Sequence, residues 1–295
     1  MMKPSTRKSY QDRIDRVIGY LSEQVDSSPS LASMADIAAI SPFHFHRVYR
    51  AMTGETPSMT LRRLRLVKAC HLLKSTDKPI TEVAFDVLYD SSQSFARAFR
   101  AATNYSPSEI RNKPSALDRA IEALSVPAGK LRLDQGGIEI KISSLEPFKV
   151  VAARHLGPHQ GLFESYGKFF AFAEKAGWIE SFKGIYGIPI DDPRETEEDQ
   201  CRFDCCFEFG PDVEPDAPYR DESLGGGLFA VLRHIGHYDG LDEKYNYLYG
   251  SWLESSGYWL RSAPLYNHYV QDPDSVPPEE WETDIYLPIQ EGNDI

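Results

Sequence analysis

The sequence has few cysteines and no apolar segment long enough to span a bilayer. The four cysteines are Cys70, Cys201, Cys205 and Cys206, one isolated and three within six residues, so they do not form a disulfide framework. No apolar run approaches the roughly 20 residues of a membrane helix, and the N-terminus lacks the apolar core of a signal peptide. With 41% hydrophobic and 26% charged residues the chain is typical of a globular protein. We expect it in the cytoplasm.

Motifs of common enzymes and metal sites are also missing. The chain contains no GxSxG, no P-loop, no GxGxxG that opens a helix and no HExxH. The cysteines at 201–206 have no neighbouring histidine and alternate like a strand, which favours buried thiols over a metal or redox site. His155 and His234 most simply end strands at equivalent turns. We therefore expect no catalytic residue, metal or cofactor.

The charge is divided unevenly along the chain. Residues 1–115 hold 17 Lys and Arg against 11 Asp and Glu, a net charge of +6, whereas residues 116–295 hold 15 against 33, a net charge of −18. A basic region can neutralise phosphates and an acidic region is repelled by them, so the first is the candidate for DNA. Two solvated surfaces of different composition are the alternative explanation.

The pattern of helices and strands predicts two domains and a linker. Residues 1–113 show short helical segments with tight breaks and predict an all-α domain. Residues 114–135 contain Pro, Ser and Pro-Ala-Gly around a short helical stretch, which is typical of a linker. Residues 136–295 alternate like strands, with helical stretches near 162–175 and 241–255, and predict an α+β domain.

The α+β region contains an internal repeat with an offset of 79 residues. RHLGPHQGLFESY from Arg154 matches RHIGHYDGLDEKY from Arg233 in its Arg, His, Gly, Gly, Leu, Glu and Tyr. Each copy predicts a strand that ends at Gly157 or Gly236, then a turn and a helix. We expect two similar units that share one sheet, with a ligand site between them.

Two segments of the helical region have the pattern of a helix-turn-helix. In the first, an apolar helix at 31–39 is followed by Ser41 as N-cap and Pro42 at the first position of a helix that Gly54 closes. A single such unit could equally be a plain helical hairpin. The pattern therefore needs support from a second copy.

That second copy follows about 50 residues later. It consists of a helix at 80–87 and a second helix that Ser91 or Ser92 caps. Two units, each with an arginine-bearing second helix, favour a protein that inserts both second helices into successive major grooves of DNA. Two tandem reading helices let one chain bind DNA, so either a monomer or a homodimer is compatible with the sequence.

Outward positions on these second helices are the candidate base readers. Gln and Arg pair bidentately with adenine and guanine edges. The long helix at 59–75 connects the units and carries basic residues suited to phosphates. The outward residues are Phe43, His46, Arg47 and Arg50 on the first helix and Gln93, Ser94, Arg97 and Arg100 on the second, and the phosphate candidates are Arg62, Arg63, Arg65 and Lys68.

The first ~112 residues resemble the AraC/XylS family of transcription regulators. The resemblance lies in FHRVYRAMTGETP and in SFARAFRAATNYSP followed by Arg111. It implies a regulator that binds double-stranded DNA and acts on RNA polymerase. The chain departs from the family at Leu88-Tyr89, where Gly-Phe is frequent, and at Asn104, where Gly is frequent. The base-facing positions that it implies are Phe43, His46 and Arg47 in the first unit and Ser92, Gln93, Ser94 and Arg97 in the second.

Residues 137–290 resemble the GyrI-like small-molecule-binding domain. The resemblance lies in the paired turns RHLG and RHIG, in WLESSGY at 252–258 and in WETDIYLPI at 281–289. It implies two βαββ-type repeats around an aromatic cleft with an acidic side chain, which commonly suits lipophilic cations. Asp284 stands where relatives usually have Glu, and Asn267 replaces another Glu. The candidate ligand residues are Tyr166, Tyr245, Trp252, Tyr258, Tyr266, Tyr269 and Asp284.

Two other functions fit the same domain. Some stand-alone GyrI-like proteins hydrolyse reactive small molecules, and such chemistry here would use Asp284 and a tyrosine. A regulator that binds a partner without any ligand is the third alternative. A small-molecule effector that is amphipathic and cationic is the hypothesis that the aromatic residues favour.

Overall fold

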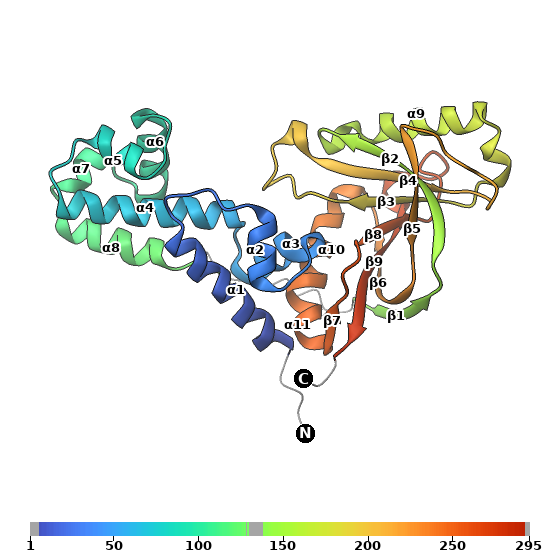
Figure 1. The fold of residues 1–295 in the computed structure, drawn as a ribbon, viewed down its shortest axis with the longest axis horizontal. Helices are drawn as coiled ribbons and strands as arrows, with labels where there is room; N and C mark the ends of the chain where they lie inside the picture. Colours follow the sequence, from blue (N-terminus) through green and yellow to red (C-terminus); the bar gives the residue numbers. More distant parts are fainter. Residues whose placement is uncertain (1–5, 128, 130–137, 293–295) are drawn as a thin grey trace, which may run out of the picture. The chain divides into compact units, whose positions relative to one another are not determined.

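The computed structural model describes residues 6–127, 129 and 138–292 of the chain. The N-terminal region is all-helical, and the C-terminal region is an α+β domain, as the sequence predicted (Figure 1). The N-terminal helices are α1 (Thr6–Glu23), α2 (Leu31–Ala38), α3 (Pro42–Thr53), α4 (Pro57–Ser75), α5 (Ile80–Asp86), α6 (Ser92–Thr103), α7 (Pro107–Arg111) and α8 (Pro114–Ser125).

Helix α8 occupies the first half of the segment that was expected to be a linker. It lies alongside α4 (Figure 1). Ala116, Leu117 and Leu124 are buried in one core with Leu66 of α4 and Phe95 of α6. The linker prediction was therefore wrong for Pro114–Ser125, because the apolar side chains of this short helix complete the core of the second helix-turn-helix unit.

The two predicted N-caps have different outcomes. The hydroxyl of Ser91 accepts a hydrogen bond from the amide of Ser94 at 3.1 Å, so Ser91 rather than Ser92 caps α6. At the start of α3, the carbonyl oxygen of Ser41 accepts from the Phe45 amide at 3.0 Å. The Ser41 hydroxyl is buried and bonds to no residue in the described part of the chain. Its predicted side-chain cap was wrong.

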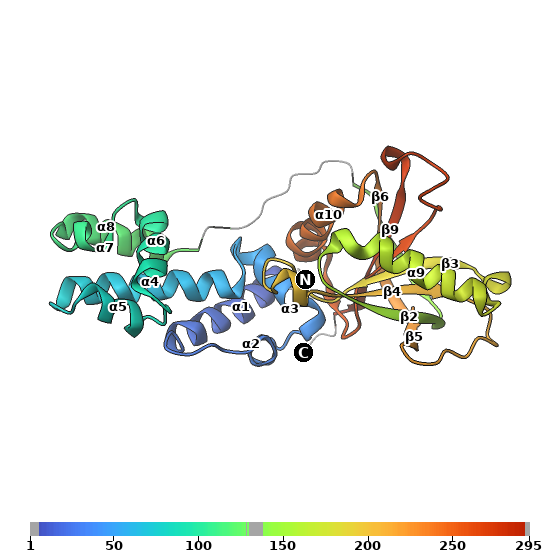
Figure 2. The ribbon, with the colours of Figure 1, turned by 90° about the horizontal axis from the view of Figure 1, so that it is seen from above.

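The C-terminal domain is built on an antiparallel sheet. Its strands are ordered β1-β6-β9-β8-β3-β4-β2-β5, and β7 pairs with β9. The strands are β1 (Ile140–Leu145), β2 (Phe148–Leu156), β3 (Gly184–Pro189), β4 (Arg202–Glu208), β5 (Tyr219–Leu224), β6 (Gly227–Ile235), β7 (Tyr258–Leu260), β8 (Tyr266–Tyr269) and β9 (Glu282–Glu291). The helices are α9 (Leu162–Lys175), which lies over β2 and β4 (Figure 2), and α10 (Leu241–Tyr247), which a π-helical turn at Leu248–Trp252 joins to α11 (Leu253–Ser256).

The predicted repeat is present as two β-α-β-β units. The units are β2-α9-β3-β4 and β6-α10-β8-β9, and equivalent hydrogen bonds close them: Gly157 N donates to Cys201 O at 2.9 Å, and Gly236 N to Trp281 O at 2.8 Å. The strand before each unit pairs with the other unit. Thus β1 pairs with β6 and β5 pairs with β2.

The repeated histidines stabilise the turns that follow their strands. His155 Nε2 lies 3.0 Å from the carbonyl oxygen of Pro158, and His234 Nε2 lies 2.9 Å from that of His237. The second repeated glycine leaves room for the ring, because a Cβ on Gly240 would lie 2.7 Å from Cε1 of His234. The prediction that these histidines end strands at equivalent turns is confirmed.

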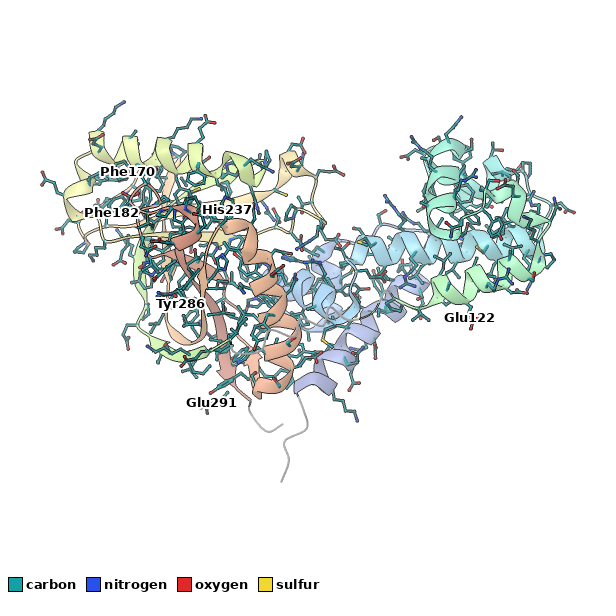
Figure 3. The ribbon with its side chains drawn as sticks, turned by 180° about the vertical axis from the view of Figure 1, so that it is seen from behind. Glu122, Phe170, Phe182, His237, Tyr286 and Glu291 are labelled. Atoms are coloured by element: carbon teal, nitrogen blue, oxygen red, sulfur yellow. The ribbon has the colours of Figure 1, made fainter. Side chains whose placement is uncertain are left out.

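The sheet has two apolar faces. On the helix face, Phe169 of α9 packs in one cluster with Phe203 and Phe207 of β4. Phe170 and Phe182, labelled in Figure 3, also contact the Phe207 ring. On the second face, a separate cluster contains the tyrosines Tyr186 and Tyr266 together with Val150, Ile188, Cys206 and Phe229. Side chains that are neighbours in a strand therefore belong to different cores.

The chain divides into two compact units that do not coincide with the two sequence regions. One unit contains the C-terminal domain, the start of α1 up to Tyr10, and Ile40–Val48. The other contains Gln11–Ala39 and the helical region from Tyr49 onward. The first half of α3 thus belongs to the unit of the C-terminal domain.

Candidate DNA-reading surface and ligand site

Helix α6 exposes the residues that were predicted to read DNA. Phe95 and Phe99 are buried and fix the helix in the core of its unit. Gln93, Arg97 and Arg100 are exposed on the outer side. Their amide and guanidinium groups have the donors and acceptors that recognise base edges in the major groove.

The two predicted serines of α6 are less accessible. Ser92 and Ser94 are half-buried. The Ser94 hydroxyl donates to the carbonyl oxygen of Ser91 at 2.9 Å, so it takes part in the helix cap. We infer that Ser94 contributes to the start of the helix, and its contact with DNA stays a prediction.

The two departures from the family's glycines fall on left-handed backbone. Leu88, in the turn between α5 and α6, has φ 57°, and Asn104, after α6, has φ 63°. Asparagine tolerates this conformation, whereas leucine pays a steric cost of roughly 1–2 kcal/mol. The turn therefore keeps the geometry that glycine would give, with strain at Leu88.

The first reading helix differs from the second in exposure. Phe43 is exposed, but His46 is 3% exposed, and Arg47 and Arg50 are half-buried. The Arg47 guanidinium donates to the carbonyl oxygen of Pro189 at 2.9 Å. Of the four predicted outward residues of α3, His46 is thus buried in this structure and Arg47 is engaged within its own unit.

Two histidines of α3, His44 and His46, are held neutral. Burial, reinforced by the neighbouring Arg47 charge, lowers the pKa of His44 to about 3, although hydrogen bonding to the Arg261 backbone opposes the shift. Burial likewise lowers the pKa of His46 to about 3. The neighbouring carboxylates Asp192 and Asp191 oppose this second shift without cancelling it. This arrangement of α3 requires both imidazoles to be uncharged.

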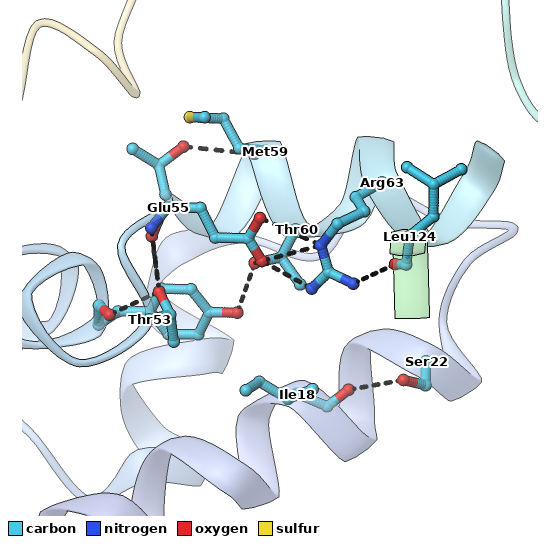
Figure 4. A network of polar contacts seen from close by, with 10 residues as sticks. Ile18, Ser22, Thr53, Glu55, Met59, Thr60, Arg63 and Leu124 are labelled. Carbon is cyan, nitrogen blue, oxygen red and sulfur yellow. Dashed lines mark hydrogen bonds and ion pairs between the residues drawn. The ribbon is translucent and has the colours of Figure 1, made fainter. Parts of the chain in front are cut away.

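Arg62 and Arg63 were both predicted to contact phosphates, but the structure gives them different environments. Arg62 is exposed. Arg63 is ion-paired with Glu55 at 2.6 Å and donates to the carbonyl oxygen of Leu124 at 2.6 Å (Figure 4). Thr60 adds a 2.7 Å hydrogen bond to the same carboxylate. The phosphate role of Arg63 is therefore corrected to an internal one that joins α4, the loop before it and α8.

The other basic candidates of α4 also have internal partners. Arg65 donates to the carbonyl oxygens of Val25 at 3.1 Å and Ser27 at 2.7 Å. Lys68 forms an ion pair with Asp26. Among the predicted phosphate contacts of this helix, Arg62 is the one that remains as a candidate.

Three of the predicted ligand residues come together on the helix face. The rings of Tyr166 and Tyr269 are 6.0 Å apart, and Tyr166 donates to the carbonyl oxygen of Tyr186 at 2.6 Å. Tyr245 exchanges hydrogen bonds of 2.8 and 3.1 Å with the side chain of Asn267. Burial raises the pKa values of all three tyrosines. We call Tyr166, Tyr245, Asn267 and Tyr269 the tyrosine cluster.

Tyr266 and Asp284 do not join the tyrosine cluster. Tyr266 is buried on the second face, stacked on Tyr286 at 4.7 Å. Asp284 forms a two-oxygen ion pair with Arg233, of which the Oδ2–Nη2 hydrogen bond is 2.8 Å. The Asp284 carboxylate is thus paired with an arginine in this structure, and its role toward a cation or in hydrolysis stays a prediction. Its partner was not foreseen.

The last two predicted ligand residues form a stack of their own. Trp252 and Tyr258 lie nearly parallel, with ring centroids 6.2 Å apart, and both are half-buried. Their ligand role stays a prediction.

Two features of the domain were missed from the sequence. Arg154 pairs with Asp204 at 2.5 Å, which repeats the pairing of Arg233 with Asp284. The repeated Arg-His and the aspartate in each unit's last strand are the signal that could have found both pairs. Tyr238 also stacks on Trp281 at 4.5 Å, beside Tyr269 of the tyrosine cluster.

The described residues lack other obvious chemical sites. No group of three or more His, Cys, Asp or Glu in the described ranges could hold a metal ion. The four cysteines are free and buried. Among the helices that the structure describes, none is long and apolar enough to cross a membrane.

Two protein-family models match this chain. The model of the GyrI-like small molecule binding domain matches residues 138–290, and that of a helix-turn-helix domain matches residues 34–113. The chain belongs to the GyrI-like family. An AraC-type helix-turn-helix region precedes its GyrI-like domain.

Curated relatives and a solved structure match the same regions. The chain is 28% identical over 155 residues to the probable transcriptional regulator YgiV of Escherichia coli K12, covering 52% of this chain and 96% of YgiV. It is 30% identical over 105 residues to the regulatory protein SoxS of Salmonella typhimurium, covering 36% of this chain and 98% of SoxS. The solved EcmrR–DNA complex is 16% identical, with a TM-score of 0.44, and the match covers 93% of this chain and 99% of that one.

Proposed function

We propose that this AraC-family DNA-binding regulator reads its operator through α6 and α3 and responds to a small amphipathic cation at the tyrosine cluster. The observation that supports it best is the outer side of α6. There Gln93, Arg97 and Arg100 are exposed on a capped helix whose other side is anchored by buried phenylalanines. Such a helix presents specific hydrogen-bonding groups in a fixed frame.

The ligand class is inferred from the tyrosine cluster. Burial raises the pKa values of the three tyrosines further above physiological pH, so each presents a neutral phenol ring, whose electron-rich face attracts cations. Asn267 provides an amide at the position where relatives usually have a carboxylate. Aromatic faces and neutral oxygens favour an organic cation with a large apolar surface, because such a cation loses little hydration energy on binding.

The output is proposed to be a change in transcription through RNA polymerase. YgiV and SoxS are described as regulators, and each resembles one region of this chain. We expect the GyrI-like domain to change the DNA affinity of the helical region when ligand binds, since a ligand can shift an equilibrium only by binding the two states differently.

Site selection tests the proposal directly. The purified full-length protein is used to select DNA from a random pool, with and without tetraphenylphosphonium and with a neutral apolar drug as matched control. A two-part motif with segments about one helical turn apart is expected. Enrichment that changes with the cation and not with the neutral drug supports the sensing role. If no motif is enriched under any condition, the regulator function of this chain is wrong.

A further inference from the structure

The first half of α3 is fixed by three hydrogen bonds within the unit of the C-terminal domain. His44 Nδ1 lies 2.7 Å from the Tyr249 hydroxyl, and His44 Nε2 lies 3.1 Å from the carbonyl oxygen of Arg261. Arg47 donates to the carbonyl oxygen of Pro189 at 2.9 Å. His44 and Tyr249 are almost completely buried. Breaking these contacts would cost free energy, because the polar groups on both sides would need water or new hydrogen-bond partners.

Arg47 provides a cation to the tyrosine cluster. Its guanidinium carbon lies 5.4 Å from the centroid of the Tyr245 ring, whose hydroxyl bonds to Asn267. Within the described residues no carboxylate forms an ion pair with Arg47, and its guanidinium lies against the Tyr245 ring and donates to the Pro189 carbonyl oxygen. This is the kind of environment in which organic cations are bound.

These contacts involve residues that are predicted to face DNA. His46 and Arg47 are two of the base-facing positions of α3, and His46 is 3% exposed. A 3% exposed imidazole cannot contact a base edge, and the Arg47 Nη2 that donates to Pro189 O is not available to one. The arrangement described here and the DNA-reading arrangement of α3 are therefore alternatives.

We propose that Arg47 is an internal cation that occupies the effector site and withholds the first reading helix from DNA until a cationic ligand displaces it. This inference rests on the proposed function and adds its regulation. The effector and Arg47 compete for the Tyr245 face. Ligand binding then favours the state in which α3 is released, and the size of the effect equals the difference in ligand affinity between the two states.

The inference also specifies the ligand. A competitor must present positive charge to the ring of Tyr245, but it does not need hydrogen-bond donors. Tetraphenylphosphonium is a suitable probe, because it is cationic and has no N–H or O–H group. If this probe competes with Arg47, the competition depends on its charge and apolar surface and not on hydrogen bonds.

Three full-length variants separate the contacts. Tyr249→Phe removes the hydroxyl that bonds to His44 and keeps the ring. Tyr245→Leu removes the aromatic face under Arg47. Tyr247→Phe is the matched control, because Tyr247 lies in α10 with Tyr245, directly before the π-helical turn that holds Tyr249, and has no hydrogen bond to residues 40–48 in the described structure. For each protein, anisotropy gives the affinity for the selected operator, and calorimetry gives the affinity for tetraphenylphosphonium.

The expected pattern differs for each variant. Without ligand, Tyr249→Phe binds the operator about three- to tenfold more tightly than wild type, the range of one intramolecular hydrogen bond. It also binds tetraphenylphosphonium more tightly, because release of α3 frees the site. Tyr245→Leu tightens operator binding but weakens binding of the probe. Tyr247→Phe matches wild type in both measurements.

Hydrogen exchange gives a readout that does not depend on DNA. In the wild-type protein, tetraphenylphosphonium is expected to speed amide exchange in residues 43–48, since their contacts open. Unchanged or slower exchange there, with the probe bound, overturns the proposal.

The outcomes distinguish the two hypotheses. If wild type binds operator and probe but Tyr249→Phe and Tyr245→Leu leave operator affinity unchanged or weaker, the withholding contact is wrong and the regulator function stands. If wild type binds neither operator nor probe, both are wrong. A melting temperature of the C-terminal domain that matches wild type verifies that the Tyr249→Phe protein is folded.

Discussion

Arg63 is joined to Glu55 by three hydrogen bonds, of 2.6, 3.1 and 3.1 Å, and both side chains are at most 11% exposed. The pair lies at the junction of α4 with the loop before it (Figure 4). A buried pair of this kind is costly to break, because removal of one partner leaves the other charge buried without compensation.

We therefore expect Arg63→Ala to lower the free energy of unfolding by about 3–5 kcal/mol. Arg62→Ala, at the exposed neighbouring position, should change it by less than about 0.5 kcal/mol. Urea denaturation of both variants at pH 7 is the measurement. Equal effects of the two substitutions would mean that the Arg63–Glu55 pair contributes little to stability.

A second prediction concerns the division between base reading and phosphate binding. Arg97→Ala should weaken binding to the selected operator by about 1–3 kcal/mol and relax the choice of base at one position. Arg62→Ala should weaken operator and random DNA alike and reduce the salt dependence of binding by about one phosphate contact. Titrations at two salt concentrations with both DNAs separate these effects. An equal loss of selectivity in both variants would refute the assignment.

Leu88 leads to a prediction in the opposite direction, towards greater stability. Its φ of 57° and its 46% exposed side chain mean that glycine relieves strain and loses little burial. We expect Leu88→Gly to raise the free energy of unfolding by about 0.5–1 kcal/mol. Phe85→Gly, an exposed position of α5 without a positive φ, is the control and should be destabilising by about 1 kcal/mol. Destabilisation by Leu88→Gly would show that the leucine side chain contributes more than the strain costs.

The buried histidines of α3 predict a pH dependence. The pKa of His44 is lowered to about 3 by burial and by the charges of Arg47 and Arg261, and that of His46 to about 3 by burial and Arg47 against Asp192 and Asp191. Free imidazoles titrate near 6.5, so between pH 6.5 and pH 3 the released or unfolded state binds more protons. The stability of the contact is therefore complete above about pH 6.5 and is lost as the pH falls.

Each such histidine contributes a slope of up to about 1.4 kcal/mol per pH unit in that window. Urea denaturation at pH 5 and pH 7 measures it for wild type and for His44→Gln. The variant should lose part of the pH dependence. His71→Gln, at an exposed histidine of α4, serves as the control and should keep it. If His44→Gln retains the full wild-type slope, the burial of this ring does not govern acid sensitivity.

The sequence predicted the elements better than the partners of individual side chains. The repeat at 79 residues predicted the strand, turn and helix that open each unit, because strand-ending glycines and turn histidines are local requirements, and the family resemblance implied the remaining two strands. Arg62 and Arg63 are adjacent, however, and no local pattern tells which one faces Glu55. The strand β5 lacks a clear apolar alternation, since its sequence YRDESL is dominated by charged and polar residues at the edge of the sheet, where solvent satisfies them.

The candidate ligand residues show the same limit. Tyr266 and Asn267 are consecutive in β8, but alternation in a strand sends them to opposite faces, and only Asn267 joins the tyrosine cluster. The family resemblance identified positions without giving the register that pairs Asp284 with Arg233. That pairing depends on a contact between strands 51 residues apart in sequence.

The exchange of strands between the two repeats constrains how this chain is made. Because β1 pairs with β6 and β5 pairs with β2, neither repeat can complete its own sheet edge. During synthesis β1 leaves the ribosome long before its partner β6, and β6 in turn pairs with β9, the last strand of the domain. A chain that lacks β6 and β9 would therefore expose an open, aggregation-prone edge at β1.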